Sequence, residues 1–249
     1  GAKALAKIAS AGPELARRVA EVPGALAALV AAVAAGRDAA GISLQEAAAH
    51  SAKALAHITS RDFQLSRRVA EVPVALATLV AAVAAPSTGA APWLQHAAAH
   101  SASVLADIAW AGDDVLQRFV ELPGALATLV AALAAGSAEA THSLHDTAAN
   151  SALALSRIAD SGKDFARRVV DVPSALQTLL AAMAAGGATA APSLHGAAEY
   201  SAKALLHIAS AGAELARQVA EVPGMLPALV SSVAAGSTAA TSSLQSAAV

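Results

Sequence analysis

The stretch EVPGALAALVAAVAAG, residues 21–36, recurs at intervals of fifty residues, and this recurrence decides the fold. Its counterparts align without a gap as EVPVALATLVAAVAAP at 71–86, ELPGALATLVAALAAG at 121–136, DVPSALQTLLAAMAAG at 171–186 and EVPGMLPALVSSVAAG at 221–236. A fixed period of this size is typical of stacked supersecondary units. Such units bury their apolar faces only against their neighbours, so the sequence predicts one continuous solenoid.

Each unit is expected to contain three helices. The first runs from about Pro13 to Val22. The second begins at Pro23, because proline is favoured at the first helical position, and it stops at Gly36. The third and longest helix spans about residues 43–60, where Ser43 opens a capping box of the form S-x-x-E.

Composition favours an all-α protein and excludes several other classes. The 249 residues are 56% apolar, largely through alanine, and only 2% aromatic. Alanine is the strongest helix former, because it loses no side-chain entropy on ordering. The absence of cysteine excludes disulfides and thiolate zinc sites.

The apolar runs are too short for membrane insertion. The longest, such as residues 25–35, contain about 11 residues, whereas a bilayer-spanning helix needs about 20. The first ten residues also lack the pattern of a signal peptide. We therefore expect an intracellular, cytoplasmic protein with no membrane insertion.

Two segments of the repeat resemble the armadillo family. The junction RRVAEVPGAL at 17–26 is similar to the family's boundary between its first two helices, and MLPALV at 225–230 is the closest match. LQEAAAHSAKALAHITS at 44–60 is similar to the family's third helix. The resemblance implies a right-handed α-solenoid of stacked three-helix armadillo-like repeats, with a period of 50 residues that exceeds the roughly 40–47 usual for this class.

The resemblance covers the whole chain as a single solenoid, residues 1–249. It predicts a partial repeat at 1–10, repeats at about 11–60, 61–110, 111–160 and 161–210, and a partial repeat at 211–249. Both ends fall inside a third helix, so we expect a segment of a longer array. The alternative is head-to-tail self-association, because SLQSAAV at the end and GAKALAKIAS at the start together spell one third helix, one residue short.

The resemblance also implies a concave face lined by the third helices. In peptide-binding members of the family, a ladder of Trp and Asn on this face grips an extended peptide. The matching Asn positions here hold Lys7, His57, Asp107, Arg157 and His207, and the matching Trp positions hold Lys3, Lys53, Ser103, Leu153 and Lys203. Because the ladder is absent, we do not expect import-type recognition of a basic peptide.

The candidate partner-binding residues are the polar positions of the third helices that vary between copies while the core positions repeat. They are Lys3, Lys7, His50, Lys53, His57, His100, Ser103, Asp107, Asn150, Arg157, Tyr200, Lys203 and His207. Variation leaves these positions free to recognise a partner, although an unconstrained exposed face would vary as well. Cations outnumber acids among them, which favours an acidic or polar partner segment.

Three other features have two interpretations each. His96 and His100 have a metal-compatible spacing, but no H-E-x-x-H motif accompanies them, so we expect surface histidines and no cofactor. The arginine pairs, such as Arg17 with Arg18, suit either phosphate binding or helix pairing, and matching acids favour helix pairing. Trp93 and Trp110 are either binding anchors or covers for loop–helix junctions.

Function is predicted to be protein binding without catalysis. The sequence contains no G-x-S-x-G elbow, P-loop or dinucleotide fingerprint. The leading hypothesis is a scaffold that presents its concave third-helix surface to a partner polypeptide, within a larger assembly. The alternatives are an RNA-binding helical repeat, which the net charge of -2 and the few aromatics disfavour, and a structural array that assembles head-to-tail.

Overall fold

The computed structural model describes residues 1–37, 41–60, 62–84, 89–136, 140–186 and 192–231, and these ranges contain helices and no strand. The segment 243–249, on which the head-to-tail hypothesis depends, lies outside them. The third helices of successive repeats are α1 (Ala2–Ser10), α4 (Ile42–Thr59), α7 (Pro92–Ile108), α10 (His142–Asp160) and α13 (Pro192–Ser210).

The other two helices of each repeat are shorter. The first helices are α2 (Pro13–Glu21), α5 (Phe63–Glu71), α8 (Asp113–Glu121), α11 (Lys163–Val170) and α14 (Ala213–Glu221). The second helices are α3 (Ala25–Arg37), α6 (Ala75–Ala84), α9 (Ala125–Ala135) and α12 (Ala175–Ala185), and residues 225–231 are also helical.

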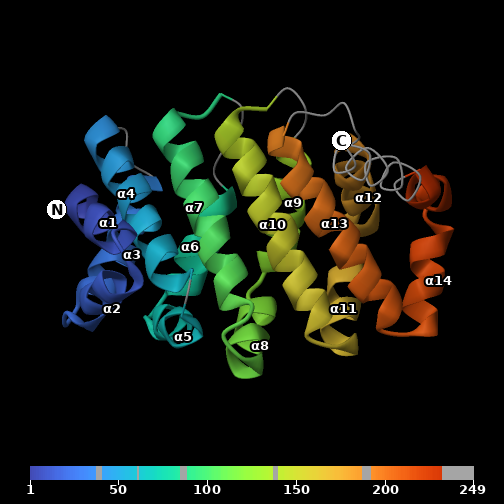
Figure 1. The fold of residues 1–249 in the computed structure, drawn as a ribbon, viewed down its shortest axis with the longest axis horizontal. Helices are drawn as coiled ribbons and strands as arrows, with labels where there is room; N and C mark the ends of the chain where they lie inside the picture. Colours follow the sequence, from blue (N-terminus) through green and yellow to red (C-terminus); the bar gives the residue numbers. More distant parts are fainter. Residues whose placement is uncertain (38–40, 61, 85–88, 137–139, 187–191, 232–249) are drawn as a thin grey trace, which may run out of the picture.

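The helices form an α-solenoid in which the second and third helices make two layers and the first helices lie at one edge. The third helices pack side by side in the order α1, α4, α7, α10, α13, and the second helices pack behind them in the order α3, α6, α9, α12 (Figure 1). The chain bends by 90° between α2 and α3 and by 80° between α8 and α9. The first helices α2, α5, α8 and α11 lie along the lower edge of the stack in Figure 1, and α14 stands at its right-hand end.

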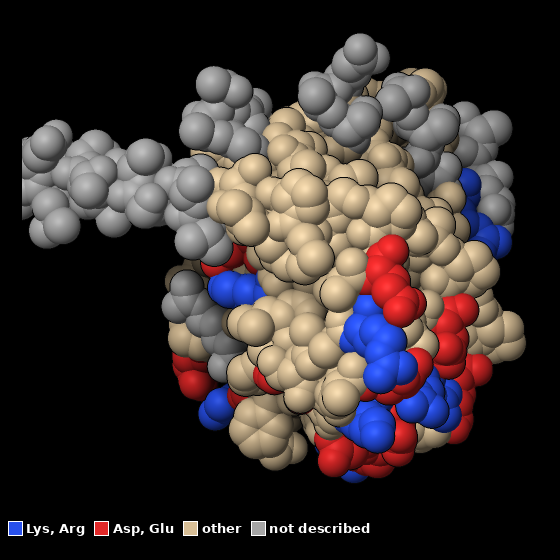
Figure 2. Space-filling model, turned by 90° about the vertical axis from the view of Figure 1, so that its right-hand side faces the viewer, with Lys and Arg blue, Asp and Glu red and all other residues tan. Residues whose placement is uncertain are grey.

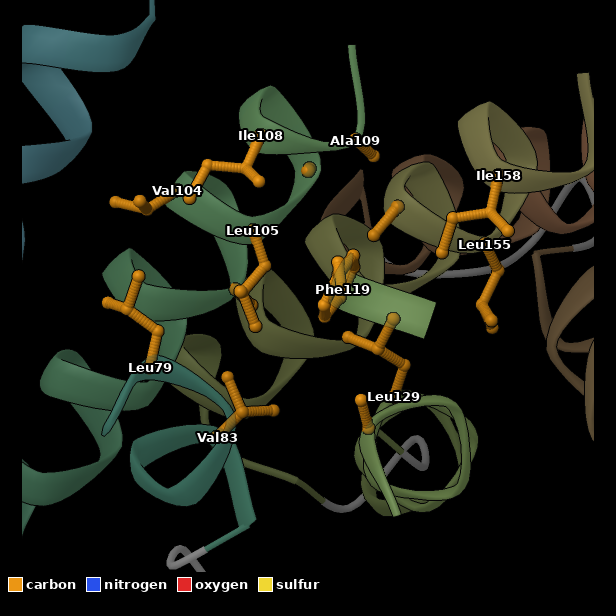
Figure 3. Close-up of a cluster of buried hydrophobic side chains, with 14 of the residues drawn as sticks. Leu79, Val83, Val104, Leu105, Ile108, Ala109, Phe119, Leu129, Leu155 and Ile158 are labelled. Atoms are coloured by element: carbon orange, nitrogen blue, oxygen red, sulfur yellow. The ribbon is translucent and has the colours of Figure 1, made fainter. Parts of the chain in front are cut away.

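The core runs continuously from repeat to repeat. Leu79, Leu105, Phe119, Leu129 and Leu155, which come from five successive helices, are fully buried where those helices meet (Figure 3). Burying each of these side chains stabilises the fold by about 1.5–3 kcal/mol. Between them lie alanines with no exposed surface, such as Ala52, Ala102 and Ala152 in the third helices. Their small side chains let neighbouring third helices approach closely.

The second helix begins two residues later than predicted. Pro23 and Gly24 form a turn instead, in which the Ala25 N–H donates to the Val22 carbonyl over 3.0 Å. Gly24 has φ +77°, as the third residue of a type II turn requires, and proline suits the second residue. Two repeats place other residues at this left-handed position, namely Val74 (φ 60°) and Ser174 (φ 64°).

The predicted capping box at Ser43 is wrong. The helix α4 starts at Ile42 with Gly41 as its N-cap, so Ser43 already lies inside the first turn. No side chain caps this end, because the residue at the cap position is a glycine with extended backbone. Only in α10, among the third helices whose N-caps are described, does a side chain cap the start, where Thr141 accepts from the Leu144 N–H.

The predicted helix stop at the glycine of the repeated stretch is confirmed at Gly136 and Gly186, which cap α9 and α12, and is wrong at Gly36; all three glycines have a further role. Gly36 lies inside α3, and Gly136 and Gly186 directly follow α9 and α12. A Cβ atom at any of the three would overlap the Cβ of an alanine in the third helix of the same repeat, Ala48, Ala148 or Ala198. The glycine is therefore required for the close approach of the second helix to the third.

The arginine pairs connect neighbouring repeats. Arg68 donates to the carbonyl of Ala20 at the end of α2, and Arg118 donates to the carbonyl of Ala70 at the end of α5. A side-chain donor there satisfies one of the carbonyls that a helix end leaves free. Arg17 donates to Asp62 of the next repeat over 2.9 Å. Asp62 is the N-cap residue of α5, so this bond joins α2 to the start of α5.

The charged residues gather along the first helices. Figure 2, which views the end of the stack at α14, shows Lys, Arg, Asp and Glu mainly over the lower half, where the first helices lie in Figure 1. Among the described residues no single helix is long and apolar enough to cross a membrane. Two pairs, α2 with α3 and α8 with α9, reach that length and composition only when joined across their sharp bends.

Val74→Gly is expected to stabilise the protein by about 0.5–1 kcal/mol. A non-glycine residue in the left-handed region costs roughly 1–2 kcal/mol, which the substitution removes. Glycine has greater conformational entropy in the unfolded chain, and this offsets part of the gain. Val74 is 74% exposed, so little burial is lost. Urea unfolding measures the change. The matched control is Gly124→Val, at a position with open space around it, and it should destabilise the protein by about 1–2 kcal/mol. If both variants were as stable as the parent chain, the strain assigned to this left-handed position would be contradicted.

Gly136→Ala is expected to destabilise the protein by about 1–3 kcal/mol, because the added methyl group forces α9 away from α10. A simple helix-end glycine would give the opposite sign, since alanine favours helix. The control is Gly89→Ala, where no atom lies within 4 Å of the new Cβ. Thermal unfolding followed by circular dichroism compares the two, and a Gly136→Ala variant as stable as the parent would refute the close-approach role.

Candidate interaction surface on the third helices

The predicted binding residues occupy the part of each central third helix that reaches solvent. In α7, from Ala97 to Ile108, every residue is buried except His100, Ser103 and Asp107. The same three positions are open in α4 and α10. We call this surface the third-helix face, made up of Lys3, Lys7, His50, Lys53, His57, His100, Ser103, Asp107, Asn150, Leu153, Arg157, Tyr200, Lys203 and His207. Its lysines are exposed and its other residues are half-buried.

At its α10–α13 end the third-helix face is hollowed. Seven of the residues around the hollow, whose volume is about 300 Å³, are Trp110, Leu153, Arg157, Asp160, Tyr200, Lys203 and His207. The structure thus brings four predicted residues together, from two neighbouring helices. Trp110, which follows the end of α7, is 64% exposed and therefore does not cover a junction. The hollow combines aromatic, aliphatic and charged groups, the mixture found at the centre of protein interfaces.

Arg157 is held in place by three successive helices. Its Nη1 atom donates to the Ala106 carbonyl over 2.6 Å and to the Asp107 carboxylate over 3.1 Å. Asp107 also accepts from the hydroxyl of Thr59 in α4 over 2.9 Å. The Arg157 guanidinium lies 5.3 Å from the centre of the Trp110 ring, in cation–π range. These contacts hold Arg157 and Trp110 at one edge of the hollow.

The remaining charges of the hollow are also paired. His207 Nδ1 lies 2.9 Å from Asp160, and Lys203 donates to Glu199 over 2.6 Å while its ammonium lies 5.3 Å from the Tyr200 ring centre. The Glu199 hydrogen bond raises the pKa of Lys203 above its usual value. Arg157 and Lys203 therefore each have an acidic partner within the protein, and the His207 imidazole lies beside Asp160.

The α4–α7 end has a different character. His50, Lys53 and His57 project from α4, and His96 and His100 from α7. The Trp93 ring lies between His50 and His96, with both ring centres 5.7 Å away. Nε2 of His57 is buried and has no hydrogen-bond partner among the described residues. This end is rich in imidazoles and poor in carboxylates.

Not every predicted residue is free to bind a partner. Asn150 donates to the Ala99 carbonyl over 3.2 Å, so its side chain links α10 to α7. Lys3 and Lys7 lie on α1, at the other end of the face from the hollow. In the part of the chain that the structure describes, no group of three or more His, Asp or Glu side chains is placed to hold a metal ion. The spacing of His96 and His100 thus has no third ligand there.

Sequence reasoning missed Asp160 and Glu199, and it left Trp110 undecided. Asp160 follows Arg157 by three residues, and Trp110 follows Asp107 by three, so both continue the same helical stripe. Glu199 lies four residues before Lys203 and precedes Tyr200 directly. Extending the stripe by one turn at the C-terminal end of each third helix would have included Asp160 and Trp110.

Comparison with known proteins supports the fold alone. No family model matches the chain, and no curated protein matches it. Among solved structures, the designed armadillo repeat protein YIII(Dq)4CqI superposes with a TM-score of 0.70 at 23% identity, covering 92% of this chain and 82% of that one. An engineered protein with 26% identity gives the same TM-score over 92% and 81% of the two chains.

A third similar structure carries a ligand. It is the designed armadillo repeat protein YIII(Dq.V1)4CPAF in complex with the peptide (KR)4, with a TM-score of 0.68, 24% identity and coverage of 92% and 82%. The agreement extends over nearly the whole described chain, through stacked three-helix units. The protein therefore has an armadillo-like repeat fold.

Proposed function

We propose that this chain is a scaffold whose third-helix face binds an extended segment of a partner polypeptide, without catalysis. The observation that carries the proposal is the hollow between α10 and α13, where Trp110, Arg157 and Tyr200 come together. Tryptophan, tyrosine and arginine are the residues that most often dominate the energy of protein interfaces. The third helices continue this surface across four repeats, which suits a long and narrow ligand.

The charges favour a polypeptide over a nucleic acid. Binding to phosphates requires unpaired cations, because affinity comes from neutralising the backbone. Arg17, Arg68 and Arg118 are engaged in bonds between repeats and Arg157 is bonded to Asp107, which leaves Lys3, Lys7 and Lys53 as the described cations of the third-helix face without a carboxylate partner, a small number for tracking a phosphate backbone. The face also differs from that of a receptor for a basic peptide, since its acidic residue Asp107 is already paired. A partner that offers apolar and polar side chains to the hollow fits these groups best.

Selection of twelve-residue peptides from a random display library tests the proposal without knowledge of the natural partner. We expect peptides that bind the intact chain and lose at least about tenfold in affinity on Trp110→Ala, since loss of an interface tryptophan typically costs 2 kcal/mol or more. Ser103→Arg, which places a large side chain on the face, should weaken them as well. Fluorescence anisotropy with labelled peptides measures both effects.

The matched control is Ala127→Arg, which adds the same side chain to an exposed position of α9, on a different helix layer. Binding should survive this substitution. Equal losses in Ala127→Arg and Ser103→Arg would contradict the assignment of the face. A library that yields no binder, or a single-stranded RNA that binds more tightly than every selected peptide, would contradict the proposed function itself.

A further inference from the structure

We infer that the α4–α7 end of the third-helix face is a docking site for an acidic polypeptide segment that binds more tightly as the pH falls. This inference rests on the proposed function and names the chemistry of one part of its surface. The site consists of His50, Lys53 and His57 from α4 and His96 and His100 from α7, which we call the His/Lys cluster.

The cluster is built by two helices that pack side by side. His96 and His100 are one turn apart on α7, and His50, Lys53 and His57 follow one another along the facing stripe of α4. Trp93 joins the two helices through its ring contacts with His50 and His96. The five side chains therefore share one surface patch, with an aromatic ring at one end of it.

Positive charge in this region is not balanced within the described residues. Lys53, and Lys3 and Lys7 on the adjacent α1, have no carboxylate within salt-bridge distance there. Of the two nearby acids, Asp107 is bonded to Arg157 of α10, and the Glu46 carboxylate lies 3.4 Å from His50 Nε2; the three lysines outnumber this one remaining carboxylate. The α10–α13 end, by contrast, pairs each of its cations with an acid. A partner segment with several carboxylates therefore complements the positive charge of the part of the face between α1 and α7.

Two histidines of the cluster are held neutral. Burial, followed by the fields of Lys53, His96, His57 and His50, lowers the pKa of His100 to about 4. Burial and then Lys53 lower the pKa of His57 as well. The Nε2 atom of His57 is also buried and has no hydrogen-bond partner among the described residues, which disfavours the charged imidazole further. At neutral pH Lys53 therefore supplies the positive charge, and the imidazoles of His57 and His100 can take up protons when a carboxylate binds beside them.

The sign of the pH dependence follows from linkage. A carboxylate next to an imidazole raises its pKa, so the complex binds more protons than the free protein. Affinity must then rise as the pH falls from neutral toward the free pKa of His100, near 4. In the free protein the lowered pKa values act in the opposite direction, because the unfolded chain binds more protons and acid destabilises the fold. An acidic partner offsets that loss.

Binding of labelled hexa-aspartate to the intact chain at pH 7.5 and pH 5.5, at constant ionic strength, tests the inference. We expect binding to be about tenfold tighter at the lower pH, which corresponds to an average uptake of half a proton over two pH units. Added salt should weaken it at both values, since the contacts are ionic. In a Trp110→Phe background Trp93 is the only tryptophan, so its emission should report occupation of this site.

Variants separate the roles of the residues. His57→Gln combined with His100→Gln should reduce the pH effect to less than threefold. Lys53→Gln should weaken binding at both pH values and shift the rise in affinity to higher pH, because the field of Lys53 contributes to the lowered pKa of both histidines. His207→Gln, in the ion-paired half of the face, is the matched control and should leave the ratio unchanged. If the double variant fails to fold, calorimetry of the parent chain in two buffers of different ionisation enthalpy still measures proton uptake directly.

Several outcomes would overturn the inference. They are affinity independent of pH, absence of proton uptake, a ratio altered by His207→Gln as much as by the double variant, and equal binding of hexa-lysine. Tighter binding of an oligouridylate than of hexa-aspartate at pH 5.5 would assign the cluster to nucleic acid instead. If selected peptides bind the hollow while hexa-aspartate does not bind, this inference alone fails and the proposed function stands.

Discussion

Apolar contact between successive repeats is the interaction on which the whole structure depends. Each repeat has its large aliphatic side chains on surfaces that only the next repeat can cover, as Leu105 and Leu155 show in adjacent third helices. The alanines between them have no exposed surface, which keeps neighbouring helices close enough for van der Waals contact. Stability in such a stack is a sum over interfaces between neighbours, so a single repeat has little of its own.

Several polar side chains reinforce the same interfaces. Arg68 and Arg118 satisfy carbonyls at helix ends in the preceding repeat, and Thr59, Asp107 and Arg157 form a chain across three third helices. These bonds occupy hydrogen-bond donors and charges that, judged from the sequence alone, would be available to bind a ligand. The consequence for function is that, among the described residues of the third-helix face, the cations without a carboxylate partner are Lys3, Lys7 and Lys53, which lie on α1 and α4.

The third-helix face thereby has two parts of different chemistry. Around the hollow, aromatic rings and paired charges form a nearly neutral surface that suits anchoring by apolar and amphipathic side chains. At the α4–α7 end, an unpaired lysine lies among desolvated histidines, which suits carboxylates. A partner segment that runs along the stack would meet both parts in turn, and the relative orientation of its acidic and apolar stretches would set its direction of binding.

The sequence by itself determined the solenoid, because a repeat of fifty residues with alanine-rich helices admits no other way to bury Leu29, Leu79 and their counterparts. It also located the exposed stripe, since positions such as 50, 53 and 57 vary while their neighbours repeat. It mistook Pro23 for a helix start and Gly36 for a helix stop. A local pattern does not distinguish a turn that needs φ > 0, or a close approach to Ala48, from an ordinary helix end.

Only the tertiary structure decided which polar residues meet. The partners of Arg157 lie fifty residues away in sequence, and those of Arg17 lie in the next repeat, so spacing within one helix could not reveal them. The hollow beside Trp110 and the surroundings of His100 likewise combine residues of neighbouring third helices, α10 with α13 and α4 with α7. The periodicity of the sequence predicts which face of each third helix is exposed to solvent. The packing of neighbouring repeats determines how far each polar group on that face is buried and which charge it is paired with.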